Sequence, residues 1–160
     1  MEYRHGIGWD VHRLAAGRRL VLGGFEIPSE LGLEGHSDAD VLSHAITDAL
    51  LGAAALGDIG LHFPDTDPRW RGADSTLFLR TALQMLQEHG WRLVHVDSTV
   101  VLERPKLGPY RDAIRLRLAA ALELDPARVS VKFKTAEGLG PAGEGRAAEA
   151  YAVVTLSRDA

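Results

Sequence analysis

The sequence predicts an α+β fold, a two-layer sandwich in which helices cover one face of a mixed β-sheet. Two observations support this fold class. Segments with helical periodicity and segments rich in β-branched residues follow one another in the order strand, hairpin, helix, helix, strand, helix, strand, strand. The chain has 160 residues and no linker-like or low-complexity tract, so we expect one domain over residues 1–160.

The chain begins with predicted β-structure. A strand is expected over residues 7–12, and a hairpin-like pair over residues 19–22 and 25–28 turns at the two glycines at positions 23 and 24.

Two helices are predicted next. The first spans residues 38–56, with Ser37 and Asp40 as a capping box at its start. Its apolar residues at helical spacing are Leu42, Ala45, Ile46, Ala49, Leu50 and Ala53. The second spans residues 75–89 and ends before Gly90, because glycine commonly follows the last turn of a helix.

The second half of the chain completes the predicted sheet. Strands are expected over residues 93–102, 129–134 and 147–156, and a helix over residues 109–124. The sheet face away from the helices would carry Val, Ala and Thr side chains that nothing else in this chain covers. We therefore expect the sheets of several subunits to pack together in an oligomer.

Composition argues against several classes of protein. The absence of cysteine excludes disulfides and thiolate metal sites. A formal net charge of −4, without a long Lys/Arg run, argues against nucleic acid as a partner, although local basic residues could bind a small anion. No apolar run approaches the roughly 20 residues that cross a bilayer, so a cytoplasmic protein without a membrane partner is expected.

Asp10 and His12 are the first candidate functional residues. Strand side chains alternate with period two, so both can reach one metal ion, and His44 could supply a third ligand. One carboxylate and two imidazoles leave an open position on a zinc ion, as in catalytic sites. Taken alone, the Asp-x-His pattern favours the alternative, which is surface polar residues at the end of a strand.

The predicted start of the first helix is a candidate anion site. With Ser37 as the N-cap, free N–H groups and the positive end of the helix dipole would face His36 and Ser37. Asp48, one turn after His44, could orient its imidazole. The alternative is that Ser37 is only a cap and His44 only a polar flank.

Two further regions contain candidate binding residues. Residues 57–68 are interpreted as a long loop whose carboxylates could hold polyol hydroxyl groups or form Asx turns. Residues 104–109 and 132–137 follow strands and offer cationic and hydroxyl groups suited to a nucleotide. Glu137 could bind a hard cation such as Mg²⁺. Ordinary strand-end loops are the alternative.

The motifs in combination resemble one family. They are DVHRL, GHSDADVLSHAITDALLGAAALGDIGLHFPDTDP, WRGADS, VDSTVVLERPKLGPY and VKFKTAEGLG. In this order and spacing, from about residue 7 to residue 156, the chain is similar to the 2-C-methyl-D-erythritol 2,4-cyclodiphosphate synthases. The resemblance implies a lyase of the non-mevalonate isoprenoid pathway that cyclises 4-diphosphocytidyl-2-C-methyl-D-erythritol 2-phosphate and releases CMP. It also implies a homotrimer with active sites between subunits.

The resemblance assigns roles to individual residues. It implies Zn²⁺ on Asp10, His12 and His44, and a second divalent cation, Mg²⁺ or Mn²⁺, on Glu137 and the substrate phosphates. It implies catalytic roles for His36, Lys106 and Thr135. The implied substrate-binding residues fall into a 2-phosphate group, a methylerythritol group and a cytidine-diphosphate group: His36 and Ser37; Asp58, Ile59, Gly60, Phe63 and Asp65; Lys106, Leu107, Phe133, Lys134 and Thr135.

The chain departs from the family pattern at two places. Lys134 replaces a hydroxyl residue that contacts phosphate, and Glu144 and Arg146 stand in exchanged order. An exchanged pair two apart in a strand could keep a local or inter-subunit salt bridge, so no phosphate-binding role is assigned to Arg146. These departures leave two alternatives to the synthase. One is a zinc-dependent nucleotide- or isoprenoid-diphosphate-binding protein without turnover, and the other is a zinc phosphohydrolase.

Overall fold

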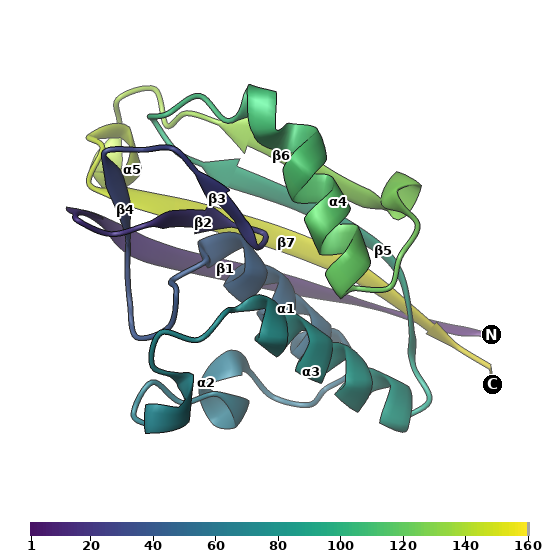
Figure 1. Cartoon of the computed structure of the whole chain (residues 1–160). Helices are drawn as coiled ribbons and strands as arrows, with labels where there is room; N and C mark the ends of the chain where they lie inside the picture. Colours follow the sequence, from purple (N-terminus) through teal and green to yellow (C-terminus); the bar gives the residue numbers. More distant parts are fainter. Residues whose placement is uncertain (160) are drawn as a thin grey trace.

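The computed structural model describes residues 1–159, so the last residue of the predicted domain, 160, lies outside the described residues. Within this range the chain forms a five-stranded mixed sheet of order β4-β1-β7-β5-β6 and a two-stranded β2-β3 sheet (Figure 1). The strands are β1 (Glu2–Ala16), β2 (Leu20–Leu22), β3 (Phe25–Ile27), β4 (Leu31–Glu34), β5 (Arg92–Val101), β6 (Val129–Lys134) and β7 (Ala147–Arg158).

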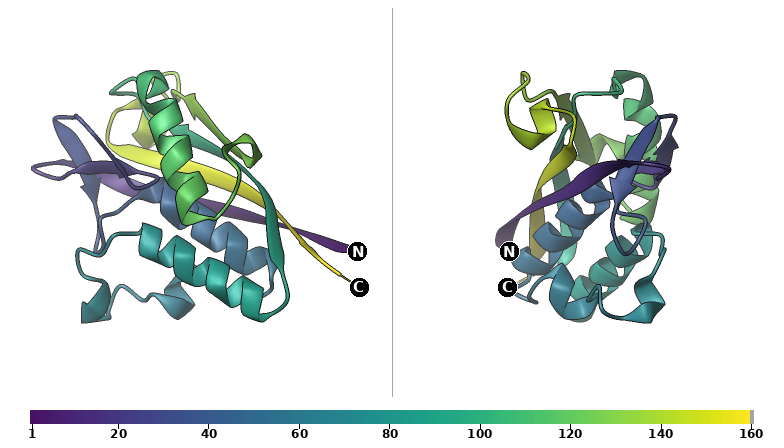
Figure 2. Two further views of the ribbon diagram at one scale, coloured as in Figure 1. Left: turned by 45° about the vertical axis from the view of Figure 1, so that its right-hand side comes forward. Right: turned by 90° about the vertical axis from the view of Figure 1, so that its left-hand side faces the viewer.

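The three longer helices gather on one face of the sheet, so the predicted α+β sandwich is confirmed (Figures 1 and 2). The longer helices are α1 (Val41–Ala53), α3 (Thr76–Glu88) and α4 (Arg111–Ala121). The short helices are α2 (Ile59–His62) and α5 (Gly140–Gly143), with 3₁₀ turns over Pro68–Trp70, Gly108–Tyr110 and Pro126–Arg128. No helix within residues 1–159 is both long and apolar enough to span a bilayer.

Strands β1 and β7 are the longest strands of the sheet and lie next to each other. They pair antiparallel from Glu2 opposite Arg158 to Arg13 opposite Ala147. Strand β7 also pairs antiparallel with β5, and β5 pairs parallel with β6 through the α4 crossover. Two chain ends thus leave the sheet side by side, away from α2 (Figure 1).

Glycines in β1 set the position of α1. A Cβ atom at Gly8 would collide with the Ala45 carbonyl oxygen of α1, and one at Gly6 would collide with the Ala49 carbonyl oxygen. The helix therefore lies directly on the strand backbone, because only glycine permits so close an approach. This packing brings the first turn of α1 beside the part of β1 that contains Asp10 and His12.

Four sequence predictions need correction. Strand β1 is much longer than residues 7–12. Strand β4 was not predicted, because its four residues are too few to show alternation. Helix α1 begins at Val41 with Asp40 as its N-cap, so the Ser37–Asp40 capping box is wrong. The loop over residues 57–68 contains helix α2, which begins because the Asp58 carboxylate accepts the Leu61 N–H.

The sheet face away from the helices is apolar and open to solvent in the described chain. Its exposed side chains in the paired strands β1 and β7 include Ile7 at 73%, Trp9 at 50%, Tyr151 at 43% and Val153 at 45%. Exposures of this size are unusual for adjacent large apolar residues, which are normally buried when they cluster. The predicted uncovered face is therefore present.

Candidate metal and substrate site

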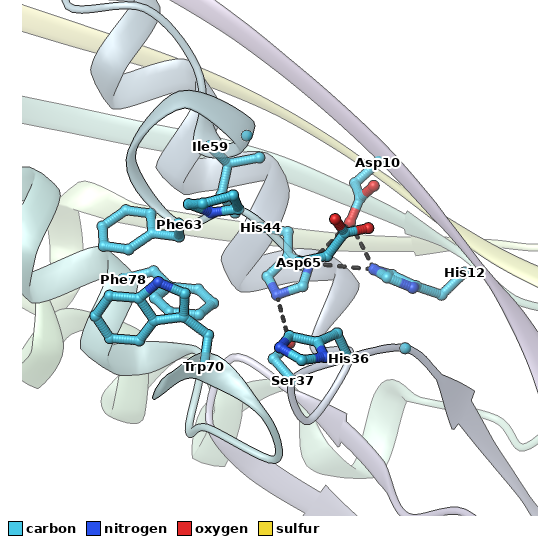
Figure 3. A pocket seen from close by; sticks show the side chains of 13 residues that line it. Asp10, His12, His36, Ser37, His44, Ile59, Phe63, Asp65, Trp70 and Phe78 are labelled. Atoms are coloured by element: carbon cyan, nitrogen blue, oxygen red, sulfur yellow. Dashed lines mark hydrogen bonds and ion pairs between the residues drawn. The ribbon is translucent and has the colours of Figure 1, made fainter. Parts of the chain in front are cut away.

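Asp10, His12 and His44 point toward one another from β1 and α1 (Figure 3). The Asp10 Oδ2 atom lies 2.9 Å from His12 Nε2 and 3.1 Å from His44 Nδ1. The two ring nitrogens lie 3.1 Å apart. The three predicted metal ligands are thus brought together by the long strand and the helix that packs on it.

The geometry of this group fits one small metal ion. Zinc with ligands at about 2.0–2.1 Å in a tetrahedron has ligand atoms roughly 3.3 Å apart, close to the three separations found here. The donors are one carboxylate and two imidazoles, with no fourth protein ligand in the group within residues 1–159. Such a set leaves a coordination position for an exogenous ligand.

Electrostatics at the site favour an ionised Asp10 carboxylate. Burial alone would raise the pKa of the Asp10 carboxyl, but hydrogen bonds from His12 and His44 hold that pKa well below its usual range. Burial alone would lower the pKa of His12, yet the Asp10 carboxylate raises it above its ordinary value. Protons and a metal cation would therefore compete for the same three donors.

In both histidines, the ring nitrogen that faces away from the metal group has a hydrogen-bond partner. His12 Nδ1 donates to the Glu34 carbonyl oxygen of β4 at 3.0 Å, which turns Nε2 toward the site. His44 Nε2 lies 2.8 Å from Ser75 Oγ, at the start of α3. His44 is buried in the first turn of α1, so it is not an exposed polar residue at the side of the helix.

Asp48 does not orient His44. Its carboxylate accepts the Ile59 N–H at 2.8 Å and so anchors α2 to α1. The predicted role of Asp48 is therefore wrong, and Ser75 occupies the place expected for it. The anion site at a free helix N-terminus is also wrong in its details, because the Asp40 carboxylate accepts the Ser43 N–H at 3.0 Å. Ser37 instead accepts the Ala39 N–H.

The metal group lies in a cavity of about 380 Å³ (Figure 3). Nine predicted residues line it: Asp10, His12, His36, Ser37, His44, Ile59, Gly60, Phe63 and Asp65. Four residues that the sequence reasoning missed complete the wall: Gly35, Pro64, Trp70 and Phe78. Trp70 lies in the WRGADS motif, which marked the region but not the side chain, and Phe78 resembled an ordinary core residue of a helix.

Aromatic rings form one side of this cavity. Phe63 stacks on Phe78 with ring centroids 4.5 Å apart, and Trp70 meets Phe78 edge to face at 5.6 Å. The cavity thus has an apolar wall opposite a polar, metal-binding wall. Asp58 does not line the cavity, since its carboxylate caps α2.

The predicted nucleotide-binding residues form a separate depression of about 230 Å³. Lys106, Leu107, Phe133, Lys134 and Thr135 line it, and Arg111 adds a further cation that the sequence reasoning missed. Its lining shares no residue with the metal cavity, and Glu137 is not part of the metal group found within residues 1–159.

The two departures from the family pattern also have positions in the structure. Lys134 ends β6 and lines the nucleotide depression. Glu144 and Arg146 form a local ion pair with 2.7 Å between Oε2 and a guanidinium nitrogen. They lie between α5 and β7 rather than within a strand, so the predicted local salt bridge is present without the predicted shared strand face.

The fold is an α+β sandwich, and its cavity has an Asp-His-His group at one wall and aromatic rings at another. These features define a class of protein that could bind a metal ion together with a small ligand. The chain belongs to the YgbB family, whose model matches residues 3–157. Its relatives show that this is the family of the 2-C-methyl-D-erythritol 2,4-cyclodiphosphate synthases.

Three comparisons document the relationship. The 2-C-methyl-D-erythritol 2,4-cyclodiphosphate synthase of Solibacter usitatus is 66% identical over 98% of this chain and 99% of its own. A solved synthase structure with CDP bound is 48% identical, with a TM-score of 0.89 over 96% of this chain and 100% of that chain. The bifunctional IspDF of Campylobacter jejuni is 40% identical, with a TM-score of 0.95 over 99% of this chain and 43% of that chain.

Proposed function

We propose that this chain converts 4-diphosphocytidyl-2-C-methyl-D-erythritol 2-phosphate into 2-C-methyl-D-erythritol 2,4-cyclodiphosphate and CMP, in the non-mevalonate pathway to isoprenoid precursors. The observation that carries the proposal is the Asp10-His12-His44 group, which lies in a cavity of about 380 Å³. The chain that forms this cavity is 66% identical to a named synthase. The binding protein without turnover is not favoured by these relatives.

We propose that Asp10, His12 and His44 hold Zn²⁺. When bound there, zinc would supply positive charge that polarises and neutralises a phosphate group. Glu137, at the loop after β6, is proposed to hold Mg²⁺ or Mn²⁺ together with the substrate phosphates, because hard cations prefer oxygen ligands.

The residues of the metal cavity are proposed to position the 2-phosphate and the methylerythritol unit. His36 Nε2 donates to the Asp67 carbonyl oxygen at 2.9 Å, which fixes its ring at the cavity rim beside Ser37. Ile59, Gly60, Phe63 and Asp65 would hold the carbon chain and its hydroxyl groups, and Asp58 would act through the fold of α2.

The proposed reaction is an intramolecular displacement. An oxygen of the 2-phosphate attacks the β-phosphorus, the new P–O bond closes the ring, and the bond to CMP breaks with its electron pair on CMP. The 2-phosphate is anionic at neutral pH, so no general base is required. Holding both ends of one molecule in place removes most of the entropic barrier. Lys106 and Thr135 would stabilise charge on the departing CMP.

We further propose a homotrimer with active sites at subunit interfaces. The apolar open face of β1 and β7 supplies a surface for packing, and the metal cavity and nucleotide depression are separate within one chain. A neighbouring subunit could join them into one site. Mixed trimers of Asp10→Ala and Lys106→Ala subunits, each inactive alone, are expected to regain part of the activity. Inactivity of verified mixed trimers would contradict a shared site.

The activity is tested by incubating purified protein with the diphosphocytidyl substrate and Mg²⁺ while following the products by phosphorus NMR. Equal amounts of CMP and cyclic diphosphate are expected. Linear phosphates would instead indicate a phosphohydrolase, and substrate binding without products would indicate the binding protein. A cytoplasmic location stays a prediction, which fractionation of the producing cells would test.

A further inference from the structure

The ring nitrogen of His44 that faces away from the metal group lies in a buried hydrogen-bond network. His44 Nε2 is 2.8 Å from Ser75 Oγ and 3.2 Å from Ser37 Oγ. Ser75 is fully buried and Ser37 is 7% exposed, so these contacts are shielded from bulk water. A neutral imidazole has one donor and one acceptor nitrogen, so these partners decide which nitrogen keeps a lone pair.

Asp38 determines the direction of the Ser75 hydroxyl. Its Oδ1 atom forms a very close contact with Ser75 Oγ, and its Oδ2 atom accepts the Ser75 backbone N–H at 3.1 Å. An ionised carboxylate only accepts hydrogen bonds, so the Ser75 hydroxyl proton points at Asp38. That hydroxyl can then only accept from His44, which requires a proton on His44 Nε2.

With Nε2 protonated, Nδ1 is the His44 nitrogen that can offer a lone pair once the proton it shares with the Asp10 carboxylate is lost. It lies 3.1 Å from Asp10 Oδ2 and 3.1 Å from His12 Nε2, at the centre of the metal group. The other tautomer would place a proton on Nδ1 and prevent coordination. A backbone hydrogen bond also holds Asp38 close to Ser75, because the Asp38 N–H donates to the Ala73 carbonyl oxygen at 3.0 Å.

We propose that Asp38 and Ser75 are positioning residues that fix His44 in the tautomer with Nε2 protonated and Nδ1 free for the metal. Neither residue belongs to the metal group or lines the metal cavity. The inference rests on the metal site of the proposed function but not on turnover.

The tautomer is measured directly by long-range proton–nitrogen NMR of His44 in the metal-free protein. A protonated Nε2 is expected. In Asp38→Ala the Ser75 hydroxyl loses its acceptor and can donate to Nε2, so the population with unprotonated Nε2 should rise. A role limited to packing would leave the tautomer ratio unchanged. An unprotonated Nε2 in the unsubstituted protein would overturn the proposal.

The consequence for the metal is measured by zinc affinity from chelator competition, without substrate. Ser75→Ala should weaken zinc binding by about 10- to 100-fold, the usual effect of removing a partner of a metal ligand. Ser75→Thr keeps the hydroxyl and should restore most of the affinity. Ser98→Ala removes a buried hydroxyl that donates to the Ser130 carbonyl oxygen and does not line the metal cavity, so it should leave zinc affinity unchanged.

The outcomes separate this inference from the proposed activity. Zinc affinity in Ser75→Ala within about twofold of the unsubstituted protein would refute the positioning role, whatever the turnover. Weak zinc binding with the expected tautomer would support it even in a protein that makes no cyclic product. If Ser75→Ala fails to fold by circular dichroism, the NMR result on the unsubstituted protein decides alone.

Discussion

His44 is the metal ligand supplied by a helix, and its removal should separate metal binding from folding. His44→Ala should reduce bound zinc from about one ion per chain to a trace, because Asp10 and His12 alone form a two-donor site. His89→Ala is the matched control, since His89 is exposed at the end of α3 and its ring donates to the Met85 carbonyl oxygen at 2.8 Å. Elemental analysis after dialysis measures both. Equal zinc in the two variants would contradict the ligand assignment.

Asp48 gives a pH-dependent prediction at the same scale. Burial raises the pKa of its carboxyl above the ordinary value, the Asp58 and Asp10 carboxylates add to this, and the Ile59 N–H and His44 oppose it. A raised pKa in the folded state means that stability is fully present below the ordinary Asp pKa. This contribution to stability is lost as the pH rises through the raised pKa of Asp48.

Asp48→Asn should remove this loss while its amide oxygen still accepts the Ile59 N–H. In metal-free protein the variant should gain a fraction of a kcal/mol relative to the unsubstituted chain at pH 7 and gain nothing at pH 3. Urea unfolding at both pH values measures the difference. A difference that is the same at pH 3 and pH 7 would show that the carboxyl titration does not contribute.

At the scale of elements, the contact between α1 and β1 positions the metal group. Gly8→Ala would drive a methyl group into the Ala45 carbonyl oxygen, so we expect a loss of about 1–3 kcal/mol in unfolding free energy and weaker zinc binding. Gly52→Ala is the control within α1, because nothing lies within 4 Å of its added Cβ. It should stabilise the protein by about 0.5–1 kcal/mol in urea unfolding. Equal effects would mean that the close approach is dispensable.

Elements with strong local signals could be predicted from the sequence, and elements that depend on tertiary partners could not. The periodic apolar residues of α1 and the β-branched run of β5 are visible in any window. Strand β4 exists because it pairs with the end of β1, through Arg13 opposite Glu34. The four residues of β4 do not by themselves indicate this pairing.

The candidate site divides in the same way. Asp10, His12 and His44 could be predicted from residue type, strand periodicity and the family motifs. Ser75 could not, because its contact with His44 joins residues 31 positions apart at the ends of two helices. The error about Asp48 has the same cause. Helical spacing placed it near His44, but the backbone N–H of Ile59 was the stronger partner.

At the scale of the whole molecule, the open sheet face predicts assembly. Ile7→Glu would place a charge in the proposed subunit interface, so we expect this variant to be monomeric if the unsubstituted protein is the proposed trimer. Leu116→Glu is the control, because Leu116 is 56% exposed on α4, on the helix-covered side of the sheet. Light scattering coupled to gel filtration gives the mass. A trimeric Ile7→Glu protein would exclude this face as the interface.

The pairing of Glu2 with Arg158 has a consequence for engineering. Both ends of the described chain leave one end of the sheet, and Asp10 lies eight residues further along β1, roughly 26 Å away at 3.3 Å per residue. A short linker between the ends should therefore give a circular permutant with the native strand pairing. A second domain fused at either end would lie away from the cavity, so we expect this fold to tolerate fusion within a longer polypeptide.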